Sequence, residues 1–160
     1  MSARYVVRVA HSGDLAALLD LRLALFIEGG ILGADDVTQQ ATVRQANQEY
    51  FLHHLDDAQG RSWVAEIDGK VIACGTLNFF QRAPYPGNLR GLEAYLLNMM
   101  TAPAWRRQGV ARQILQQAIA CARERGCARL WLHASDDGRP LYAAQGFQDQ
   151  PAFMELPLSA

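Results

Sequence analysis

The sequence predicts a single α/β domain with a mixed β-sheet at its centre and helices packed against it. Two observations carry this prediction. The chain has 160 residues, of which 50% are hydrophobic and 19% charged, and this suits one globular unit with a substantial core. Short β-branched and aromatic runs alternate with longer segments of helical periodicity, an order typical of a sheet covered by helices. We therefore expect residues 1–160 to form one domain.

Charge and cysteine content exclude several classes of protein. The net charge is −1, whereas binding to nucleic acid or to an anionic membrane usually needs a basic surface, so we expect neither partner. No apolar run reaches the roughly 18 residues of a membrane span, and no signal-peptide pattern opens the chain. The three cysteines lack metal-ligand spacing, which predicts free thiols, a reducing cytoplasmic location and no metal site.

The N-terminal part of the chain predicts one strand and two helices. Residues 4–10 are β-branched and partly alternating, which indicates a strand. Residues 15–28 are rich in leucine and alanine, with an apolar stripe at helical spacing, and the helix is expected to end at Gly29. A second, weakly amphipathic helix is expected over residues 37–55.

A hairpin and a long loop follow. Residues 62–67 and 70–80 read as two strands, because Asp68-Gly69 between them is a favoured two-residue hairpin turn. Gln81 to Leu92 contains two prolines and two glycines and is expected to be a loop. Loops of this length in a compact domain are often functional.

Residues 93–101 predict a central strand, because both of its faces are largely apolar. Simple alternation puts Tyr95 and Met99 on one face and Leu96 and Met100 on the other.

The next segments predict a crossover. Residues 109–125 have helical apolar spacing, with arginines in the last turn and Gly126 as the expected stop. Residues 128–133 form a short apolar run. A helix between two strands is typical of a βαβ unit, so the strands at 93–101 and 128–133 should be parallel and adjacent.

The C-terminal part predicts a short helix and closing strands. The helix is expected over residues 139–145, with Pro140 at its start and Gly146 at its end. Phe147 and residues 152–156 are expected to close the sheet.

The loop before the long predicted helix has the features of an anion site. From Asn98 to Gly126 the sequence passes through the end of a strand, a proline turn, a basic glycine-containing loop and a helix. Such an arrangement turns backbone N–H groups outward at a helix N-terminus, where they suit a phosphate or pyrophosphate. Arg106 and Arg107, beside Gly109, add positive charge.

Two motifs in order carry a family resemblance. Arg106 to Ala111 form an R-x-x-G-x-A element, and Leu141 to Phe147 form an L-Y-x-x-x-G-F element after the next strand. Together they resemble the GNAT superfamily of N-acetyltransferases, which use acetyl-CoA. The firm resemblance covers residues 93–148. The Walker A and dinucleotide-binding patterns, the usual rival phosphate cradles, are missing.

The resemblance implies a GNAT acyl-CoA N-acyltransferase fold and direct transfer of an acetyl group from acetyl-CoA to a primary amine of a small molecule or a protein. It also implies that the strands at 93–101 and 128–133 splay apart, so that the pantetheine arm of CoA pairs with the first and the pyrophosphate binds the loop. The implied cofactor-binding residues are Met99, Met100, Thr101, Arg106, Arg107, Gln108, Gly109, Val110, Ala111, Arg112, Ser135 and Tyr142.

Catalytic roles follow from the same resemblance. Tyr142 matches the family's tyrosine, the general acid that protonates the departing thiolate. Ser135 stands where many members carry a cofactor-contacting asparagine. The strand after the long helix lacks the glutamate that some members use as general base. Glu93 is the leading substitute, and His133, Glu28 or a base acting through water are the alternatives.

The acceptor is not identified by any motif. We expect the segments Phe26 to Val37 and Gln81 to Leu92 to bound its site, with Glu28 and Tyr85 as candidate substrate contacts. The missing strand glutamate leaves open a different class of function, a catalytically silent acyl-CoA-binding or regulatory module on the same fold. A homodimer is also left open.

Overall fold

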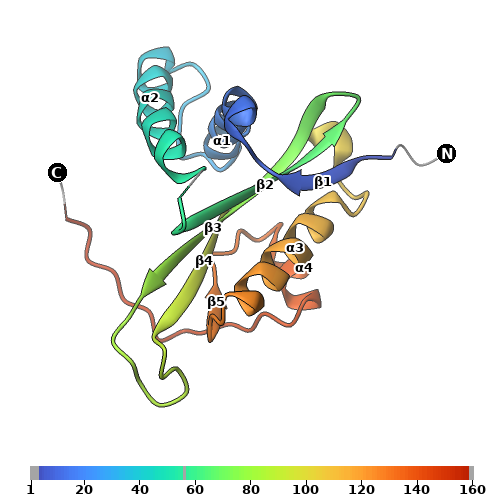
Figure 1. Ribbon diagram of the computed structural model, residues 1–160. Coiled ribbons are helices and arrows are strands. Elements are labelled where there is room, and N and C mark those ends of the chain that lie inside the picture. The colour runs from blue at the N-terminus through green and yellow to red at the C-terminus, as the bar shows by residue number, and fades with distance from the viewer. Residues whose placement is uncertain (1–3, 56, 159–160) are drawn as a thin grey trace.

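The computed structural model describes residues 4–55 and 57–158. The main elements in chain order are β1 (Val6–Val9), α1 (Leu15–Glu28), α2 (Val37–His54), β2 (Gly60–Ile67), β3 (Lys70–Gln81), β4 (Leu92–Thr101), α3 (Val110–Glu124), β5 (Arg129–Trp131) and α4 (Arg139–Ala144). The strands form one sheet in the order β1-β2-β3-β4-β5. Helices α1 and α2 lie on one face of this sheet, and α3 and α4 lie on the other (Figure 1).

The predicted elements up to α4 are confirmed. Each helix begins and ends within one residue of its predicted bounds. The β2–β3 hairpin turns at Asp68 and Gly69, which both have positive φ, as the favoured Asp-Gly turn requires. Local periodicity and turn chemistry are therefore sufficient to define most of the elements of this chain.

The sheet is mixed, as predicted. Strands β1 to β4 pair antiparallel with their sequence neighbours. Strand β5 pairs parallel with β4 after the α3 crossover, and the pairing covers only three positions, from Glu93↔Arg129 to Tyr95↔Trp131. Beyond Tyr95 the two strands part.

The core has two clusters, one on each face of the sheet. Helix α3 buries one apolar stripe against β2, β3 and β4, with Ile114, Leu115 and Ala118 fully covered. Leu18 of α1 and Phe51 of α2 are fully buried on the opposite face. Each such large side chain contributes about 1.5–3 kcal/mol to stability. None of the described helices is both long enough and apolar enough to cross a membrane.

A β-bulge in β4 corrects the predicted alternation. Between Leu97 and Met100, β4 supplies two residues, Asn98 and Met99, opposite the single Gly75 of β3, and Asn98 has a φ of 59°. Because of the extra residue, the side chains of β4 after the bulge point to the opposite face of the sheet from the one that simple alternation predicts. Met99 packs in the cluster under α3 and Met100 in the cluster under α1. The prediction that Met99 shares a face with Tyr95 is therefore wrong.

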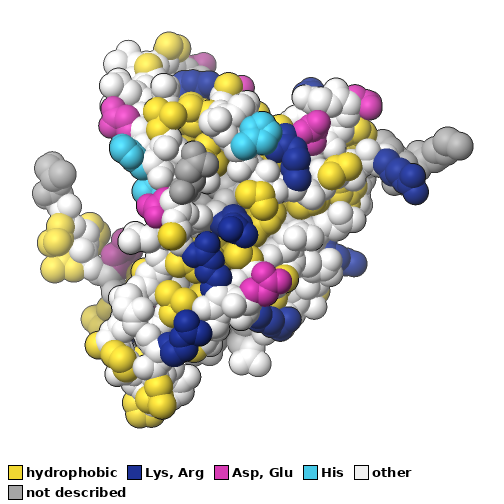
Figure 2. All heavy atoms as spheres, viewed as in Figure 1, with side chains coloured by type: hydrophobic (Ala, Val, Ile, Leu, Met, Phe, Trp, Pro, Cys, Tyr) yellow, Lys and Arg dark blue, Asp and Glu magenta, His cyan; other side chains and the backbone are white. Residues whose placement is uncertain are grey.

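The predicted closing strands are also wrong. Phe147 and residues 152–156 have no strand pairing; they belong to an extended segment that leaves α4 and runs to one side of the molecule (Figure 1). Phe147 packs against the core, but the apolar side chains of residues 152–158 stand exposed (Figure 2), with Met154 95% accessible. Residues 152–156 are apolar except for Glu155, but Pro151 before them lacks an N–H and the neighbouring edge strand β5 has only three residues.

Candidate active site

The parting of β4 from β5 exposes backbone groups. From Leu96 to Thr101, β4 has no partner on its β5 side in the described part of the chain. The carbonyls of Asn98 and Thr101 accept hydrogen bonds from Cys74 and Arg106, and the other N–H and C=O groups that face away from β3 are available to an extended ligand, which can add as a short pseudo-strand. The predicted pantetheine contacts Met99, Met100 and Thr101 all lie in this unpaired stretch.

The predicted anion loop follows directly at the end of β4. After a short 3₁₀ turn, Pro103–Trp105, Arg107 and Gly109 both take positive φ values, 63° and 82°. Residues Arg107, Gln108 and Gly109 are exposed, and their N–H groups form no hydrogen bond with any described residue. The first N–H groups of α3, at Val110, Ala111 and Arg112, continue the set because a helix leaves them unpaired.

The Arg106 side chain points away from this N–H cradle. Its Nε donates to the Thr101 carbonyl at 3.0 Å, and both Nη atoms donate to the Glu28 carboxylate at 2.7 and 2.6 Å. The guanidinium lowers the pKa of Glu28. The pair links α1 to the loop, so the predicted substrate contact Glu28 is neutralised by a predicted cofactor residue.

Tyr142 lies half-buried on α4, packed edge-to-face on Phe147 with ring centroids 5.8 Å apart. Its hydroxyl forms no hydrogen bond with the described residues. Burial raises the pKa of Tyr142, and the negative charge that Tyr95 would carry when ionised adds to the effect. The phenol is therefore protonated at neutral pH and its proton is free to be donated.

Ser135 has a local partner. Its Oγ accepts the Gly138 N–H at 3.1 Å and its carbonyl accepts the Arg139 N–H at 3.0 Å, so the residue shapes the turn into α4. The hydroxyl hydrogen stays available for one further bond. Ser135 thus helps to set the position of Tyr142 whatever else it contacts.

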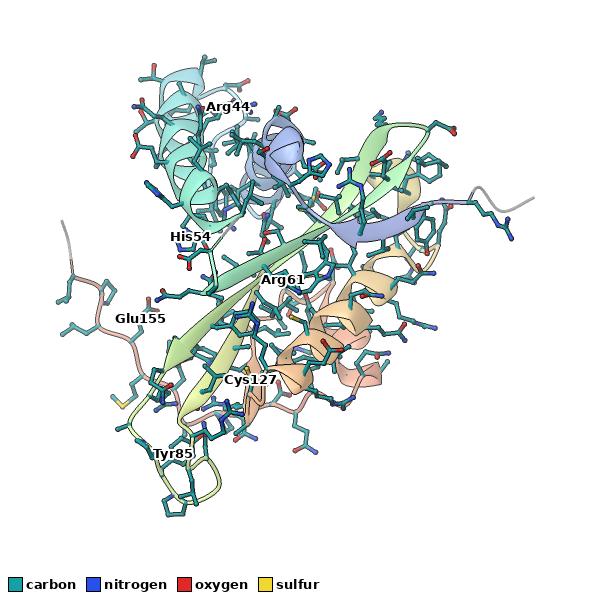
Figure 3. The ribbon with its side chains drawn as sticks, viewed as in Figure 1. Arg44, His54, Arg61, Tyr85, Cys127 and Glu155 are labelled. Carbon is teal, nitrogen blue, oxygen red and sulfur yellow. The ribbon has the colours of Figure 1, made fainter. Side chains whose placement is uncertain are left out.

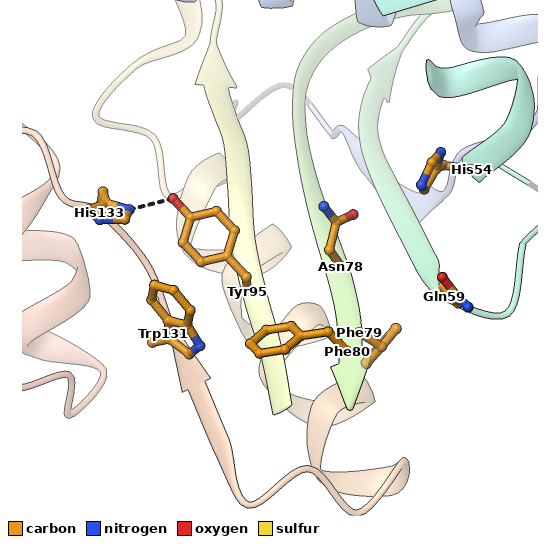
Figure 4. A pocket seen from close by; sticks show the side chains of 8 residues that line it. All are labelled: His54, Gln59, Asn78, Phe79, Phe80, Tyr95, Trp131 and His133. Atoms are coloured by element: carbon orange, nitrogen blue, oxygen red, sulfur yellow. Dashed lines mark hydrogen bonds between the residues drawn. The ribbon is translucent and has the colours of Figure 1, made fainter. Parts of the chain in front are cut away.

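A cavity of about 390 Å³ opens beside the point where β4 and β5 part (Figure 4). Its walls are aromatic rings, amides and two histidines, contributed by α2, β3, β4, β5 and their flanking loops. The lining residues are His54, Gln59, Asn78, Phe79, Phe80, Tyr95, Trp131 and His133.

Tyr95 and His133 form the polar centre of this cavity. The Tyr95 hydroxyl and the His133 Nδ1 are 2.6 Å apart, and the Tyr95 ring meets Trp131 edge-on at 4.7 Å (Figure 4). His133 is exposed, and its ring also contacts the Phe153 ring with centroids 5.4 Å apart.

Glu93 and Tyr85 contact each other, but the Glu93 carboxylate is buried. The Glu93 side chain is 0% exposed, and its carboxylate accepts hydrogen bonds from the Tyr85 hydroxyl at 2.8 Å and from Arg82 at 3.3 Å. Tyr85 belongs to the loop that joins β3 to β4 (Figure 3). These contacts tie the loop to the start of β4, so the two predicted residues form a structural anchor.

The sequence did not identify Tyr95, Trp131 or Asn78 as site residues. Each lies on a strand, where an aromatic or amide side chain is ordinarily explained by packing. Only Asn78 could have indicated a site from the sequence, because it is a polar residue within an otherwise apolar strand. Which strand face stays open depends on the β4–β5 divergence, and no local pattern encodes that.

Comparisons with known proteins agree with this architecture. The model of the acetyltransferase (GNAT) family matches residues 31–147. A predicted acetyltransferase from Clostridium acetobutylicum, solved with acetyl-CoA, is similar over 96% of each chain, at 30% identity and a TM-score of 0.86. A GCN5-related N-acetyltransferase from Ralstonia eutropha is similar over 97% of this chain and 99% of its own, at 29% identity and a TM-score of 0.84. The search of curated proteins gave no significant match.

Proposed function

The chain belongs to the acetyltransferase (GNAT) family, and we propose that it transfers an acetyl group from acetyl-CoA directly to a primary amine. The observation that carries this proposal is the continuity of two features. The unpaired backbone of β4 leads straight into a loop whose N–H groups point outward at the N-terminus of α3. An extended arm that ends in a pyrophosphate is complementary to both.

The residues present fit acetyl-CoA, which is the co-substrate and supplies the activated acetyl group as a thioester. The N–H groups from Arg107 to Arg112 would bind the pyrophosphate, with the helix dipole adding to the attraction. Met99, Met100 and Thr101 would pair their backbone with the pantetheine arm. A free N–H of β4 near the bulge would stabilise negative charge on the thioester oxygen.

Tyr142 is proposed as the general acid. Acyl transfer forms the bond between the amine nitrogen and the acetyl carbon and breaks the bond between that carbon and sulfur. The Tyr142 O–H donates its proton to the departing thiolate and later regains one from solvent. A phenol that is half-buried and protonated at neutral pH suits this role.

His133 is proposed as the general base, in preference to Glu93. In the tautomer whose Nδ1–H is donated to Tyr95, Nε2 carries a lone pair that can take a proton from the incoming ammonium group. Glu93 is fully buried and hydrogen-bonded by Tyr85 and Arg82, so the loop would have to open before its carboxylate met an amine.

Two parallel measurements test the function. Acetyl-CoA binding is followed by isothermal titration, and CoA release is followed with a thiol reagent over a panel of amines. Binding together with amine-dependent release is the expected result. Absence of binding at millimolar acetyl-CoA would refute the proposal, and binding without release on any amine would instead favour the silent module.

A further inference from the structure

Arg22 of α1 is a half-buried cation without an anionic partner. Its Nε donates to the Asn47 side-chain oxygen at 2.8 Å, and the guanidinium carbon lies 4.5 Å from the centre of the Phe26 ring. No carboxylate of the described residues forms an ion pair with it. The neighbouring Arg44 of α2, by contrast, pairs with Asp20 of α1 at 2.7 Å.

Such a residue is costly to the fold. Burial lowers the pKa of Arg22, because water that would solvate the charge has been removed. One hydrogen bond and one aromatic face replace only part of that solvation, and the Nη atoms form no hydrogen bond with the described residues. An apolar side chain of similar length would fit the same place at lower cost. The charge is therefore better explained by a ligand than by stability.

Arg22 stands on the acceptor side of the sheet. Its partner Asn47 lies three residues before Tyr50 on α2, and the Tyr50 hydroxyl donates to Asn78, a wall of the cavity, at 2.6 Å. Tyr95 forms another wall of the same cavity, and its hydroxyl contacts the proposed base His133.

The described residues that line the cavity offer no negative charge to a cationic acceptor. None of the residues that line the cavity is an aspartate or glutamate. The two acidic site candidates from the sequence are both engaged, Glu28 by Arg106 and Glu93 by Arg82 and Tyr85. A polyamine or another polycation would therefore meet neutral walls and one uncompensated positive charge.

We propose that the amine acceptor carries an anionic group, a carboxylate or a phosphate, and that Arg22 binds this group while the amine faces His133. The inference rests on the proposed acetyltransferase function and specifies its acceptor. The two Nη atoms present a geometry that takes either anion in bidentate fashion. The aromatic walls of the cavity suit an apolar body between the two ends of the acceptor.

Matched probe pairs separate the anionic group from the rest of the acceptor. Phenylalanine is compared with phenethylamine, and phosphoethanolamine with ethanolamine. The wild type is expected to show a kcat/KM roughly ten- to a hundredfold higher for the anionic member of at least one pair, as a charge-assisted hydrogen bond predicts. The pair that shows the preference tells carboxylate from phosphate.

The Arg22→Met variant should lose this preference, and Arg22→Lys should keep part of it. Arg44→Met is the matched control: it removes an arginine from the same helix pair and should leave the preference intact. Arg22→Met should also raise the melting temperature, because a desolvated charge is removed. A lower melting temperature in Arg22→Met, with the preference kept, would show that Arg22 is structural and would overturn the proposal.

A binding readout keeps this test separate from the test of the activity. The same probes are titrated by tryptophan fluorescence in the presence of CoA, for wild type, Arg22→Met and Arg44→Met. If no amine is acetylated, the proposed function fails, and the binding preference still decides the role of Arg22. If amines are acetylated and bound without regard to the anionic group, the Arg22 proposal fails and the acetyltransferase proposal stands.

Discussion

Single side chains in this site differ chiefly in how far water reaches them. Tyr142 and Tyr95 both have raised pKa values, first of all because of burial, so both remain phenols at neutral pH. Glu93 is wholly enclosed, and His133 is exposed. Solvent accessibility therefore distinguishes His133 from Glu93 as candidate bases. The sequence alone could only rank them.

The first prediction concerns the general acid. Tyr142→Phe removes the hydroxyl and keeps the ring contact with Phe147. We expect kcat to fall roughly 10²–10⁴-fold with little change in the Kd for acetyl-CoA, because proton donation acts only in the chemical step. Steady-state kinetics and titration measure the two quantities. Unchanged turnover would remove Tyr142 from the mechanism.

The second prediction compares the two candidate bases. His133→Gln should lower kcat/KM roughly 100-fold, because it removes the group that takes the proton from the incoming amine. Glu93→Gln should chiefly lower the melting temperature, because it weakens the anchor made with Arg82 and Tyr85. The reverse outcome, a silent His133→Gln and an inactive Glu93→Gln, would assign the base to Glu93.

At the scale of elements, the bulge in β4 and the anion loop determine the geometry of the cofactor site. The bulge requires close approach at Gly75, where an added Cβ would lie 2.5 Å from the Met99 Sδ and 2.7 Å from the Ile114 Cγ2. Glycine at this position therefore lets β3, the bulge and α3 pack together. The loop in turn is fixed to α1 by Arg106 and Glu28.

The third prediction tests that packing. Gly75→Ala should lower the free energy of unfolding by about 1–3 kcal/mol, as overpacking of a core usually does, and raise the KM for acetyl-CoA by displacing Met99. Gly33→Ala is the control, because an added Cβ there makes only ordinary contact with Asp36. Chemical denaturation and kinetics report the two effects. Equal stability of both variants would contradict the close approach.

The fourth prediction tests the anion loop. Arg107→Glu replaces an exposed positive charge beside the N–H cradle with a negative one and should weaken CoA binding roughly tenfold. Arg123→Glu makes the same change in charge at the far end of α3 and should leave the Kd nearly unaltered. Titration at low and high salt completes the test, because the difference between the variants should shrink as salt screens the charges.

At the scale of the whole molecule, an ion network holds the N-terminal strand against the rest of the sheet. Arg8 of β1 donates to both carboxylate oxygens of Asp14 at 2.8 and 2.9 Å and to Glu66 of β2 at 2.5 Å. Asp14 is buried at 5% exposure. Hydrogen bonds from Arg8 hold the pKa of Asp14 below its ordinary value despite that burial.

The fifth prediction follows from the sign of that shift. Because the folded-state pKa of Asp14 is depressed, its contribution to stability is present above the unfolded value of about 3.9 and is lost as pH falls through the folded value. Asp14→Asn should lower the free energy of unfolding by about 1–3 kcal/mol at pH 7. The difference from wild type should shrink below about pH 4. A constant difference from pH 7 to pH 2 would contradict the ion pair.

The sequence by itself determined the elements and the family. Helix bounds, the Asp68-Gly69 turn and the βαβ crossover all depend on neighbours within a few residues, and the loop and tyrosine motifs have fixed local spacing. That residues 1–160 form one domain stays a prediction.

Only the tertiary structure decided what those elements do together. The bulge at Asn98 depends on Gly75 of another strand, and the free closing segment depends on the length of β5. The engagement of Glu28 and Glu93 and the isolation of Arg22 depend on residues that are distant in sequence. Whether a charge is paired or solvated is set by packing across elements, and no local pattern carries that information.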